Sequence, residues 1–503
     1  MASSVTPPRG MRDFLPAEKA RRERVLAVIR DTYRAHGFDE IETPVMEDSD
    51  RLHAGLGGDN EKLAFAVMKR ALTSDDLKAA ADPLDLADLG LRFDLTVPLA
   101  RFYASHRAEL PTIFRSIQIA PVWRAERPQK GRFRQFMQCD IDIIGEAGPM
   151  AEIELISATA ATLDALGLEG CSIRINDRRL LTSALELLGF PPHEHEPVLI
   201  TIDKLDKLGH DGVITELRDR GFPAGPVDAL EAFFRRPVTM EYLPFGEAAI
   251  RKALPQGVDS VAVTELAAIG LAVEAARGGV GAQMMAPGAP TLSKPTPDGS
   301  APDERSPGVG LPSERSPGVG SPRESTPGEM SPGQPTPDVP ARPSDTAVPA
   351  PGRTQPLVQF DPWLVRGMGY YTGAIFEVAH PSLGYSLGGG GRYDGMIGRF
   401  LGSEVPAAGF SLGFERLVDL VELQHPESMD AAALIHDGSV PPAALIGMQT
   451  ELIRRGIRVR LVRKPRNMTP LLTQLAASGF SRYAVVDSHG YTLSDLKWVL
   501  LSH

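Results

Sequence analysis

One segment, from Phe114 to Glu146, constrains the fold and chemistry of this 503-residue chain more than any other. Its first part, from Ser116 to Trp123, roughly alternates polar and apolar residues, as a half-buried strand does. Its last part alternates too: the apolar side chains on one face are Met137, Cys139, Ile141 and Ile143, and the polar ones on the other face are Gln138, Asp140 and Asp142. The segment therefore predicts two strands that share one buried face and one polar face.

The loop between these strands is densely charged. Six charged residues lie between positions 124 and 134: Arg124, Glu126, Arg127, Lys130, Arg132 and Arg134. One sheet face thus carries cations at one end and hydrogen-bond acceptors at the other. That arrangement suits a ligand with a phosphate tail and an amine or imidazole head. The alternative is a solvated hairpin with surface ion pairs, because charged side chains are common on protein surfaces.

The charged loop resembles motif 2 of the class II aminoacyl-tRNA synthetases. It follows the pattern R-x-E-x-P-x-x-x-R, with Arg124, Glu126, Pro128 and Arg132 at the fixed positions. The whole segment, which ends in QCDIDIIGE, is similar to the histidyl-tRNA synthetase version of that motif. Motif 1 is similar to GFDEIETPVME, and the opening PPRGMRDFLP also matches the family.

The later motifs of the histidyl-tRNA synthetase family resemble segments near the end of the match. The histidine signature RGLDYY is similar to LVRGMGYYTGAIFEV, although Gly369 stands in the Asp position. The second signature and motif 3 are similar to LGGGGRYDG and AAGFSLGFERL. Three further segments of the chain resemble the eukaryotic-type branch of this family: LRFDLTVPLARF, INDRRLL and TIDKLDKLG. The resemblance covers about residues 5–285 and 357–420, and motifs in this order are far more specific than any one alone.

Composition narrows the class of protein and its compartment. The chain is long enough for more than one domain. Its formal charge of −11 argues against nonspecific binding to nucleic acid over the whole surface, but it permits a local basic surface. Its two cysteines, Cys139 and Cys171, do not suffice for a disulfide framework or a zinc site. It has no apolar run long enough to span a membrane and no apolar signal segment, so we expect a cytoplasmic protein without a membrane partner.

The resemblance implies an α+β catalytic core with the class II synthetase antiparallel sheet flanked by helices, a helical insertion domain and a small α/β C-terminal domain like an anticodon-binding domain. The core would comprise residues 1–170, with motifs 1 and 2, and residues 357–425, with the histidine signatures and motif 3. The helical insertion would occupy residues 171–285. A shortened C-terminal domain would occupy residues 431–503.

Hydropathy patterns predict the first elements of the core. We expect a helix from Glu18 to His36, ended by Gly37, and a strand from Ile41 to Met46. A second helix from Met150 to Leu166 and a short strand from Cys171 to Asn176 follow, and helical patterns then dominate. In the resembled family the first helix and strand form much of a dimer interface, so the resemblance implies a homodimer.

Residues 286–356 differ abruptly in composition. Pro, Gly, Ser and Thr dominate, aromatic residues are absent, and ERSPGVG occurs at Glu304 and again at Glu314. Such a stretch cannot bury enough apolar surface to offset the entropy of ordering it, so we expect a disordered insertion within the catalytic domain. The repeat is either a product of slippage or a partner-binding motif.

The C-terminal tail predicts a small α/β unit. We expect a strand near Leu434, a helix carrying Leu445 and Leu452, a strand from Ile457 to Leu461, a helix from Met468 to Ala477 and a strand from Tyr483 to Val486, in a parallel or mixed sheet. No acidic residue occurs between positions 452 and 486, where basic residues cluster. This surface is either a solvated basic face or, by its position after motif 3, an anticodon-binding surface.

The resemblance also implies which residues bind and react. Arg124 and Arg366 would be catalytic, and the ATP-binding residues would be Arg124, Glu126, Arg132 and Arg416. The histidine-binding residues would be Asp94, Leu95, Thr96, Arg124, Gln138, Asp142, Arg366, Tyr370, Tyr371 and Tyr393, with Asp142 and Tyr371 as the imidazole pair. Arg127 and Arg134 would contact the tRNA acceptor stem. Mg²⁺ would accompany ATP, without a metal site built from protein ligands alone.

Two other patterns have simpler interpretations. The glycine run from Gly388 to Gly391 lacks the GK[ST] of a phosphate loop, so it predicts close approach of the backbone to a ligand. His193 and His195 in PPHEHEP predict a polar loop rather than a metal site.

The resemblance implies a histidine–tRNA ligase that forms histidyl-adenylate from ATP and histidine and transfers the histidyl group to tRNA(His). Two alternatives remain at this point. One is a paralogue that activates histidine for an acceptor other than tRNA, which the shortened tail and Gly369 favour. The other is a regulatory subunit like that of ATP phosphoribosyltransferase, which the arginines at 124, 366 and 416 disfavour.

Overall fold

The computed structural model describes residues 5–53, 63–128, 131–236, 245–277, 357–366, 369–422, 430–487 and 492–501. The tract at 286–356, expected to be disordered, lies outside these ranges, as do its repeats. None of the described helices combines the length and apolar character needed to cross a membrane.

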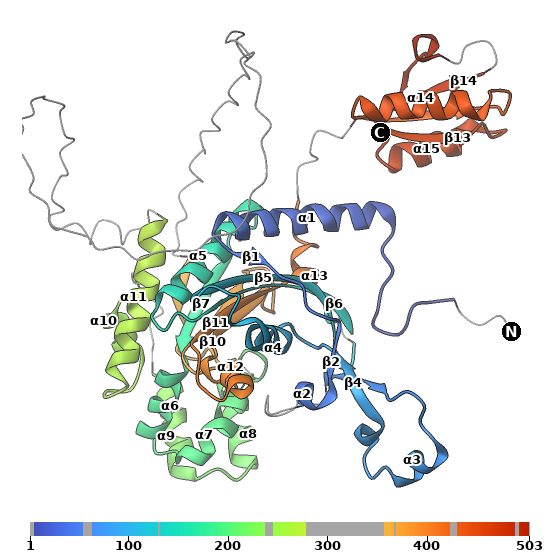
Figure 1. Cartoon of the computed structure of the whole chain (residues 1–503). Helices are drawn as coiled ribbons and strands as arrows, with labels where there is room; N and C mark the ends of the chain where they lie inside the picture. Colours follow the sequence, from blue (N-terminus) through green and yellow to red (C-terminus); the bar gives the residue numbers. More distant parts are fainter. Residues whose placement is uncertain are drawn as a thin grey trace, which may run out of the picture. The chain divides into compact units, whose positions relative to one another are not determined.

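An eight-stranded sheet forms the centre of the core (Figure 1). Its inner pairings are antiparallel, and its two outermost pairings are parallel, which confirms the predicted antiparallel sheet flanked by helices. The strands, in spatial order, are β1 (Asp39–Glu40), β5 (Phe114–Trp123), β6 (Gln135–Ile144), β11 (Ala407–Gly413), β10 (Gly388–Arg392), β9 (Ala374–Ala379), β7 (Ser172–Asp177) and β8 (Val358–Phe360).

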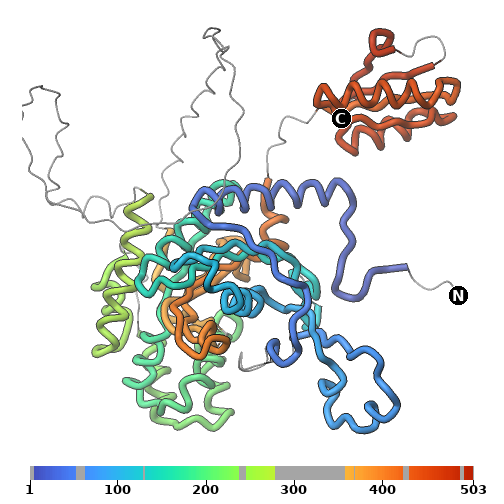
Figure 2. Tube along the Cα trace, viewed as in Figure 1, coloured from blue at the N-terminus to red at the C-terminus, as the bar shows by residue number. Residues whose placement is uncertain are grey.

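Chain segments far apart in sequence interleave in this sheet. β6 pairs with β11 and β7 pairs with β9, so strands that precede residue 278 lie beside strands that follow residue 356. Figure 2 shows this mixing of early and late colours within one sheet. A site on the sheet therefore draws residues from both parts of the chain.

The predicted faces of β5 and β6 are confirmed. Cys139, Ile141 and Ile143 are fully buried in a core formed with helices α1 (Pro16–Ala35) and α5 (Met150–Ala165). Figure 1 shows these two helices on one side of the sheet, and α4 (Thr96–His106) and α12 (Asp394–Leu401) on the other. The polar face of β6 thus faces away from the main apolar core.

The prediction of a strand from Ile41 to Met46 is wrong. Only β1 pairs with the large sheet, and β2 (Met46–Asp48) joins a separate three-stranded sheet with β4 (Ala87–Leu91) and β3 (Phe65–Met68). Between them, the buried guanidinium of Arg92 donates to the carbonyl oxygens of Thr43 at 2.8 Å and Pro44 at 3.1 Å. A side chain thus satisfies backbone groups that a strand partner would otherwise bind.

Helices follow β7, and they correct one local prediction. The segment with His193 and His195 is not a polar loop, because it forms helix α7 (Pro192–Ile202), with a proline in the first turn where no backbone N–H is needed. His195 is buried, and its Nε2 lies 2.9 Å from the Phe190 carbonyl oxygen. The other helices here are α6 (Arg178–Leu187), α8 (Leu205–Asp219), α9 (Ala224–Phe234), α10 (Glu247–Ala253) and α11 (Ser260–Ala276).

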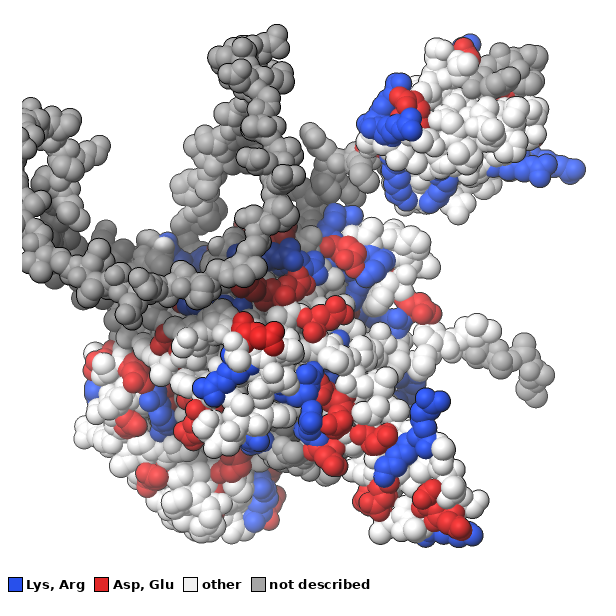
Figure 3. All heavy atoms as spheres, in the orientation of Figure 1, with Lys and Arg blue, Asp and Glu red and all other residues white. Residues whose placement is uncertain are grey.

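The C-terminal residues form an α/β unit whose predicted elements are confirmed. They are β12 (Ala431–His436), α14 (Pro442–Arg454), β13 (Arg458–Arg463), α15 (Met468–Ala477) and β14 (Arg482–Val486). The sheet is mixed, because a short strand that was not predicted, β15 (Val499–Leu500), pairs antiparallel with β14. Figure 3 shows blue basic side chains on this unit among mostly uncharged residues.

Strand β10 consists almost entirely of glycine because its neighbours leave no room for side chains. A β-carbon built on Gly390 would lie 1.9 Å from the carbonyl oxygen of Gly409 on β11. No real β-carbon approaches a backbone atom so closely, so a larger residue would force the two strands apart.

We predict that Gly390→Ala destabilises the core by at least about 2 kcal/mol, because overpacking at this position displaces backbone rather than a side chain. The midpoint of thermal unfolding should fall clearly. Gly395→Ala is the matched control, since a β-carbon on Gly395 meets nothing within 4 Å. Equal midpoints for the two variants would contradict the packing argument.

Candidate active site

A cavity of about 270 Å³ lies against the polar face of the large sheet. Strands β6, β10 and β11, the charged loop and the segments before α4 and β9 all contribute to its wall. It brings together most of the residues predicted from sequence: Asp94, Thr96, Arg124, Glu126, Arg132, Gln138, Asp142, Arg366, Tyr370, Tyr371, Tyr393 and Arg416. These residues span more than half of the chain.

Three predicted site residues do not line this cavity. Leu95 is fully buried, and its carbonyl oxygen accepts a hydrogen bond from Gln118 Nε2 at 3.1 Å. Arg127 is exposed on the charged loop. Arg134 Nε donates to the Glu126 carbonyl oxygen at 3.0 Å, so this side chain braces the loop. The proposed contact of Arg127 and Arg134 with tRNA stays a prediction.

One end of the cavity is cationic. Arg124 Nε donates to the Phe93 carbonyl oxygen at 2.9 Å, and its guanidinium lies over the Phe136 ring, 5.0 Å from the centroid. Arg416 donates to the Ser386 carbonyl oxygen, and burial together with the nearby charge of Arg132 lowers its pKa. Two neighbouring guanidinium groups are poised to bind an anion, which would relieve their repulsion.

Arg366 is held in this group by a carboxylate that the sequence analysis missed. Its Nη1 lies 2.8 Å from Glu377 Oε2 on β9, and Glu377 also pairs with Arg174 on β7. A β-carbon on Gly389 would lie 2.7 Å from Arg366 Cζ, so the guanidinium rests on the glycine backbone of β10. The glycine run therefore makes room for an arginine as well as for a neighbouring strand.

The other end of the cavity is acidic and buried. Asp94, Asp140 and Asp142 are 2%, 6% and 6% exposed, and burial raises the pKa of each. For Asp142 the pKa rises to about 7, although a hydrogen bond from Tyr393 opposes the shift. Carboxylates whose desolvation is this costly favour a ligand that brings donors or positive charge.

A phenol binds Asp142 directly. Asp142 Oδ1 accepts a hydrogen bond of 2.6 Å from the Tyr393 hydroxyl. The joint contact of Asp142 and Tyr371 with an imidazole stays a prediction, and both residues line the cavity. Tyr370 packs between the other two rings, with centroids 4.7 Å from Tyr371 and 6.1 Å from Tyr393. All three phenols line the cavity beside the acid.

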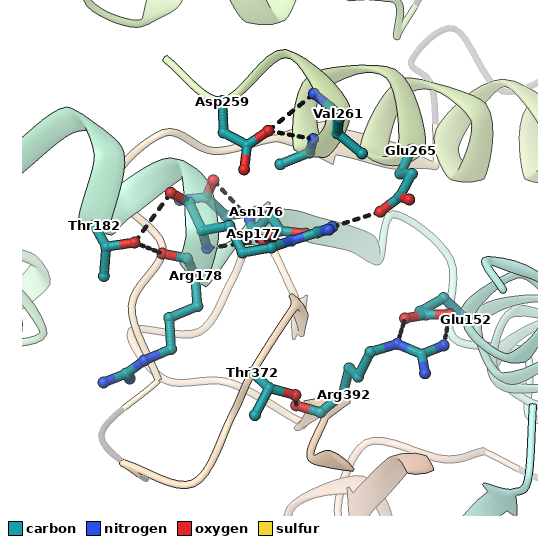
Figure 4. Close-up of polar contacts among 12 residues, drawn as sticks. Glu152, Asn176, Asp177, Arg178, Thr182, Asp259, Val261, Glu265, Thr372 and Arg392 are labelled. Atoms are coloured by element: carbon teal, nitrogen blue, oxygen red, sulfur yellow. Dashed lines mark hydrogen bonds and ion pairs between the residues drawn. The ribbon is translucent and has the colours of Figure 1, made fainter. Parts of the chain in front are cut away.

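The junction of β10 and α12 fixes the position of Tyr393. The preceding residue, Arg392, forms a buried double contact with Glu152 on α5, at 2.6 and 2.7 Å, and its carbonyl oxygen accepts from the Thr372 backbone N–H at 2.8 Å. Figure 4 shows the Arg392–Glu152 pair beside the contacts of Asp177 and Asp259. Arg392 therefore anchors the strand to α5, and Tyr393 faces the cavity.

Glu415 joins the cavity wall to helix α1. Its carboxylate is 6% exposed and accepts two hydrogen bonds from Arg22, at 2.7 and 2.6 Å, one from Arg12, at 2.5 Å, and one from the Met137 backbone N–H, at 3.2 Å. No local pattern indicates this cluster, because the two arginines lie about 400 residues from Glu415 in the chain. Glu415 precedes Arg416 and fixes the start of α13 (Phe414–Leu417).

The space beside Gly369 is filled by another acid. A β-carbon on Gly369 would lie 2.8 Å from Glu196 Oε1, and Glu196, on α7, pairs with Arg178. This chain lacks the aspartate that the family signature has at position 369, and a carboxylate from α7 lies beside that position.

The described residues contain no group of three or more His, Cys, Asp or Glu side chains arranged to hold a metal ion. Glu126 offers one carboxylate at the cationic end, 3.6 Å from Arg132. This donor set fits Mg²⁺ only where phosphate oxygens and water complete the coordination, which is the usual way that Mg²⁺ accompanies a nucleotide.

Comparisons with known proteins agree on one family. The histidyl-tRNA synthetase family model matches residues 10–269 and 348–417. The chain is 50% identical over 492 residues to the histidine–tRNA ligase of Leifsonia xyli subsp. xyli, covering 97% of this chain and 96% of that one. It is 38% identical to the probable histidine–tRNA ligase of Tropheryma whipplei, covering 96% of both.

Among solved structures, the fold is similar to that of histidyl-tRNA synthetase from Nostoc sp. PCC 7120. The TM-score is 0.64 at 21% identity, and the match covers 99% of this chain and 96% of the other. The similarity supports the class II synthetase architecture for the sheet and its helices.

We predict that Glu415→Gln lowers the stability of the core by about 3 kcal/mol or more, because it leaves the buried guanidinium of Arg22 without its counter-ion. Thermal unfolding of the two proteins measures the difference. Glu23→Gln is the matched control on the same helix, since Glu23 is half exposed and forms a surface ion pair with Lys19. A similar midpoint for both variants would show that the buried pair does not anchor α1.

Proposed function

This chain belongs to the histidyl-tRNA synthetase family, and we propose that its cavity joins histidine to ATP as histidyl-adenylate before the histidyl group passes to the 3′ end of tRNA(His). The observation that carries the proposal is the polarity of the cavity, with four arginines at one end and three buried carboxylates at the other. An aminoacyl adenylate needs both ends, because its phosphate is anionic and its amino-acid head carries donors.

The arginines perform the first step by positioning and charge stabilisation. The histidine carboxylate attacks the α-phosphorus of ATP, a new C–O–P linkage forms, and diphosphate leaves. Arg124 and Arg366 hold the α-phosphate as charge builds on its oxygens, and Arg132 and Arg416 hold the β- and γ-phosphates. No covalent enzyme intermediate is required, so preorganised guanidinium groups supply the main catalytic effect.

The acidic end selects histidine. Asp94, Thr96 and Gln138 accept from the α-ammonium group, while Asp142, with Tyr393 bonded to it, accepts from an imidazole N–H. Tyr370 and Tyr371 enclose the ring. An amino acid without ring nitrogens would leave the buried Asp142 with no donor from the ligand, which disfavours its binding strongly.

Mg²⁺ bound to ATP would be held by the phosphates and by Glu126, and it would neutralise part of the charge on the triphosphate. In the second step the tRNA 3′-terminal hydroxyl attacks the histidyl carbonyl, and AMP leaves. Arg127 and Arg134 of the charged loop are proposed to meet the acceptor stem.

Finer features of the assignment are proposed on the same grounds. The motifs LRFDLTVPLARF and TIDKLDKLG support the eukaryotic-type branch, although the two relatives named above are bacterial. The C-terminal unit, residues 431–503, would read the anticodon through its basic residues, and residues 171–285 would form the helical insertion. A homodimer in the cytoplasm is the proposed working form, because the family's first helix and motif 1 form a dimer interface.

We predict that the purified chain catalyses histidine-dependent exchange of diphosphate into ATP and that Arg366→Ala lowers the rate about 10²- to 10³-fold, since it removes a donor to the developing phosphate charge. Arg251→Ala, which changes an exposed arginine on α10, is the matched control. Charging of tRNA(His) is measured in parallel. Exchange without charging would identify a paralogue with another acceptor, and absence of exchange would overturn the proposal.

We predict that the KM for histidine rises as the pH falls through about 7, because the carboxyl group of Asp142 is then protonated and, without its charge, is a weaker acceptor for the imidazole N–H. Tyr393→Phe removes the hydrogen bond that lowers this pKa, so the inflection should move to higher pH. The substrate imidazole titrates identically in both enzymes and cancels in the comparison. Tyr483→Phe, in the C-terminal unit, serves as the control; an unmoved inflection in Tyr393→Phe would refute the role of the pair.

A further inference from the structure

Three buried acceptor oxygens in the cavity wall have no hydrogen-bond partner within the described protein. They are Asp94 Oδ2, Gln138 Oε1 and Asp140 Oδ1. Buried acceptors are nearly always paired, because leaving one unpaired costs about 1–3 kcal/mol. Three such acceptors in one cavity match the three N–H donors of an ammonium group.

Two neighbours fix the orientation of the Gln138 amide. Its Nε2 donates to Asp140 Oδ2 at 3.3 Å and to Ser411 Oγ at 3.1 Å. Asp140 lies two residues along β6, and Ser411 lies opposite Asp140 in the pairing with β11. Both amide N–H groups are therefore used, and Oε1 is the atom left for a ligand.

The reverse orientation of this amide would be unfavourable. It would place Oε1 against the oxygens of Asp140 and would turn the Nε2 donors toward an incoming ammonium group. A donor facing a donor in a buried site loses a hydrogen bond and leaves both groups unpaired. The orientation of one amide thus decides whether this wall attracts or rejects an amine.

We propose that Asp140 and Ser411 are positioning residues for the aminoacylation reaction, which hold the Gln138 amide with Oε1 toward the α-ammonium group of histidine. This inference rests on the proposed histidine site. Neither residue belongs to the set transferred from the family motifs. Asp140 acts through Gln138 by its Oδ2, besides offering Oδ1 to the ammonium group, and Ser411 supplies the same constraint on the amide without a charge.

The test compares two ligands that differ in the ammonium group. The KM for L-histidine is measured by diphosphate exchange, and the Ki of 3-(imidazol-4-yl)propionate, which lacks the ammonium group, is measured as a competitor. Ser411→Ala and Asp140→Ala should each raise the KM about tenfold, a typical loss for one hydrogen bond to a charged group, and should leave the Ki of the propionate within about twofold. Ser105→Ala, on the exposed face of α4, is the control for serine removal.

A double-mutant cycle separates positioning from direct contact. If Ser411 acts through Gln138, then Ser411→Ala combined with Gln138→Ala should bind histidine no more weakly than Gln138→Ala alone. Additive effects, or an unchanged KM in the single variants, would overturn the proposal, and so would an equal rise for both ligands. Should Asp140→Ala fail to fold, Asp140→Asn keeps a carbonyl acceptor for the amide and should retain more of the wild-type KM. Wild-type enzyme without histidine-dependent exchange would instead refute the proposed function.

Discussion

Separation of charge along one strand governs how this cavity works. The acidic side chains of β6 are buried, whereas the arginines of the preceding loop remain partly exposed. If the two groups met, they would neutralise each other and leave nothing for a ligand. The ten-residue strand β6 places Asp142 well along the sheet from the loop, because residues on one face advance by about 6.5 Å. Arg124 is nearer, and its charge opposes the rise in pKa that burial causes at Asp94 and Asp140.

Residues from the second half of the chain complete the cavity that residues from the first half begin to line. Strand β11 lies beside β6 and contributes Ser411, while the segment before β9 contributes Arg366 and two tyrosines. Glycines at the contact of β10 with β11 allow this sheet to close tightly and give the Arg366 guanidinium a flat surface. The arginines of the site lie outside the strands, but contacts to Phe93, Glu377 and Ser386 hold Arg124, Arg366 and Arg416 in place, which suits a reaction that depends on positioning.

Local patterns were sufficient for some parts of this structure and insufficient for others. Alternation in β5 and β6 predicted their faces, because the period of a strand is a property of the chain itself. The pairing of Asp142 with Tyr393, and of Arg366 with Glu377, depends on which distant strands become neighbours. The segment from Ile41 to Met46 has the composition of a strand, yet Arg92 binds two of its carbonyl oxygens. The segment's own residues do not predict that contact, because Arg92 lies far along the chain. Likewise, the histidines and glutamates of PPHEHEP predicted a polar loop, but the segment forms α7, which begins at Pro192.

The carboxylate of Glu196 beside Gly369 links a signature position to a helix that is remote in sequence. An aspartate introduced at 369 would bring two acids together beside the guanidinium of Arg178, and their mutual repulsion would oppose it. Replacement of Glu196 by a small neutral residue would remove that obstacle. Positions 369 and 196 are therefore expected to change together during evolution, so that one of them supplies the acid. A family signature that covers position 369 alone would miss the compensating change at position 196.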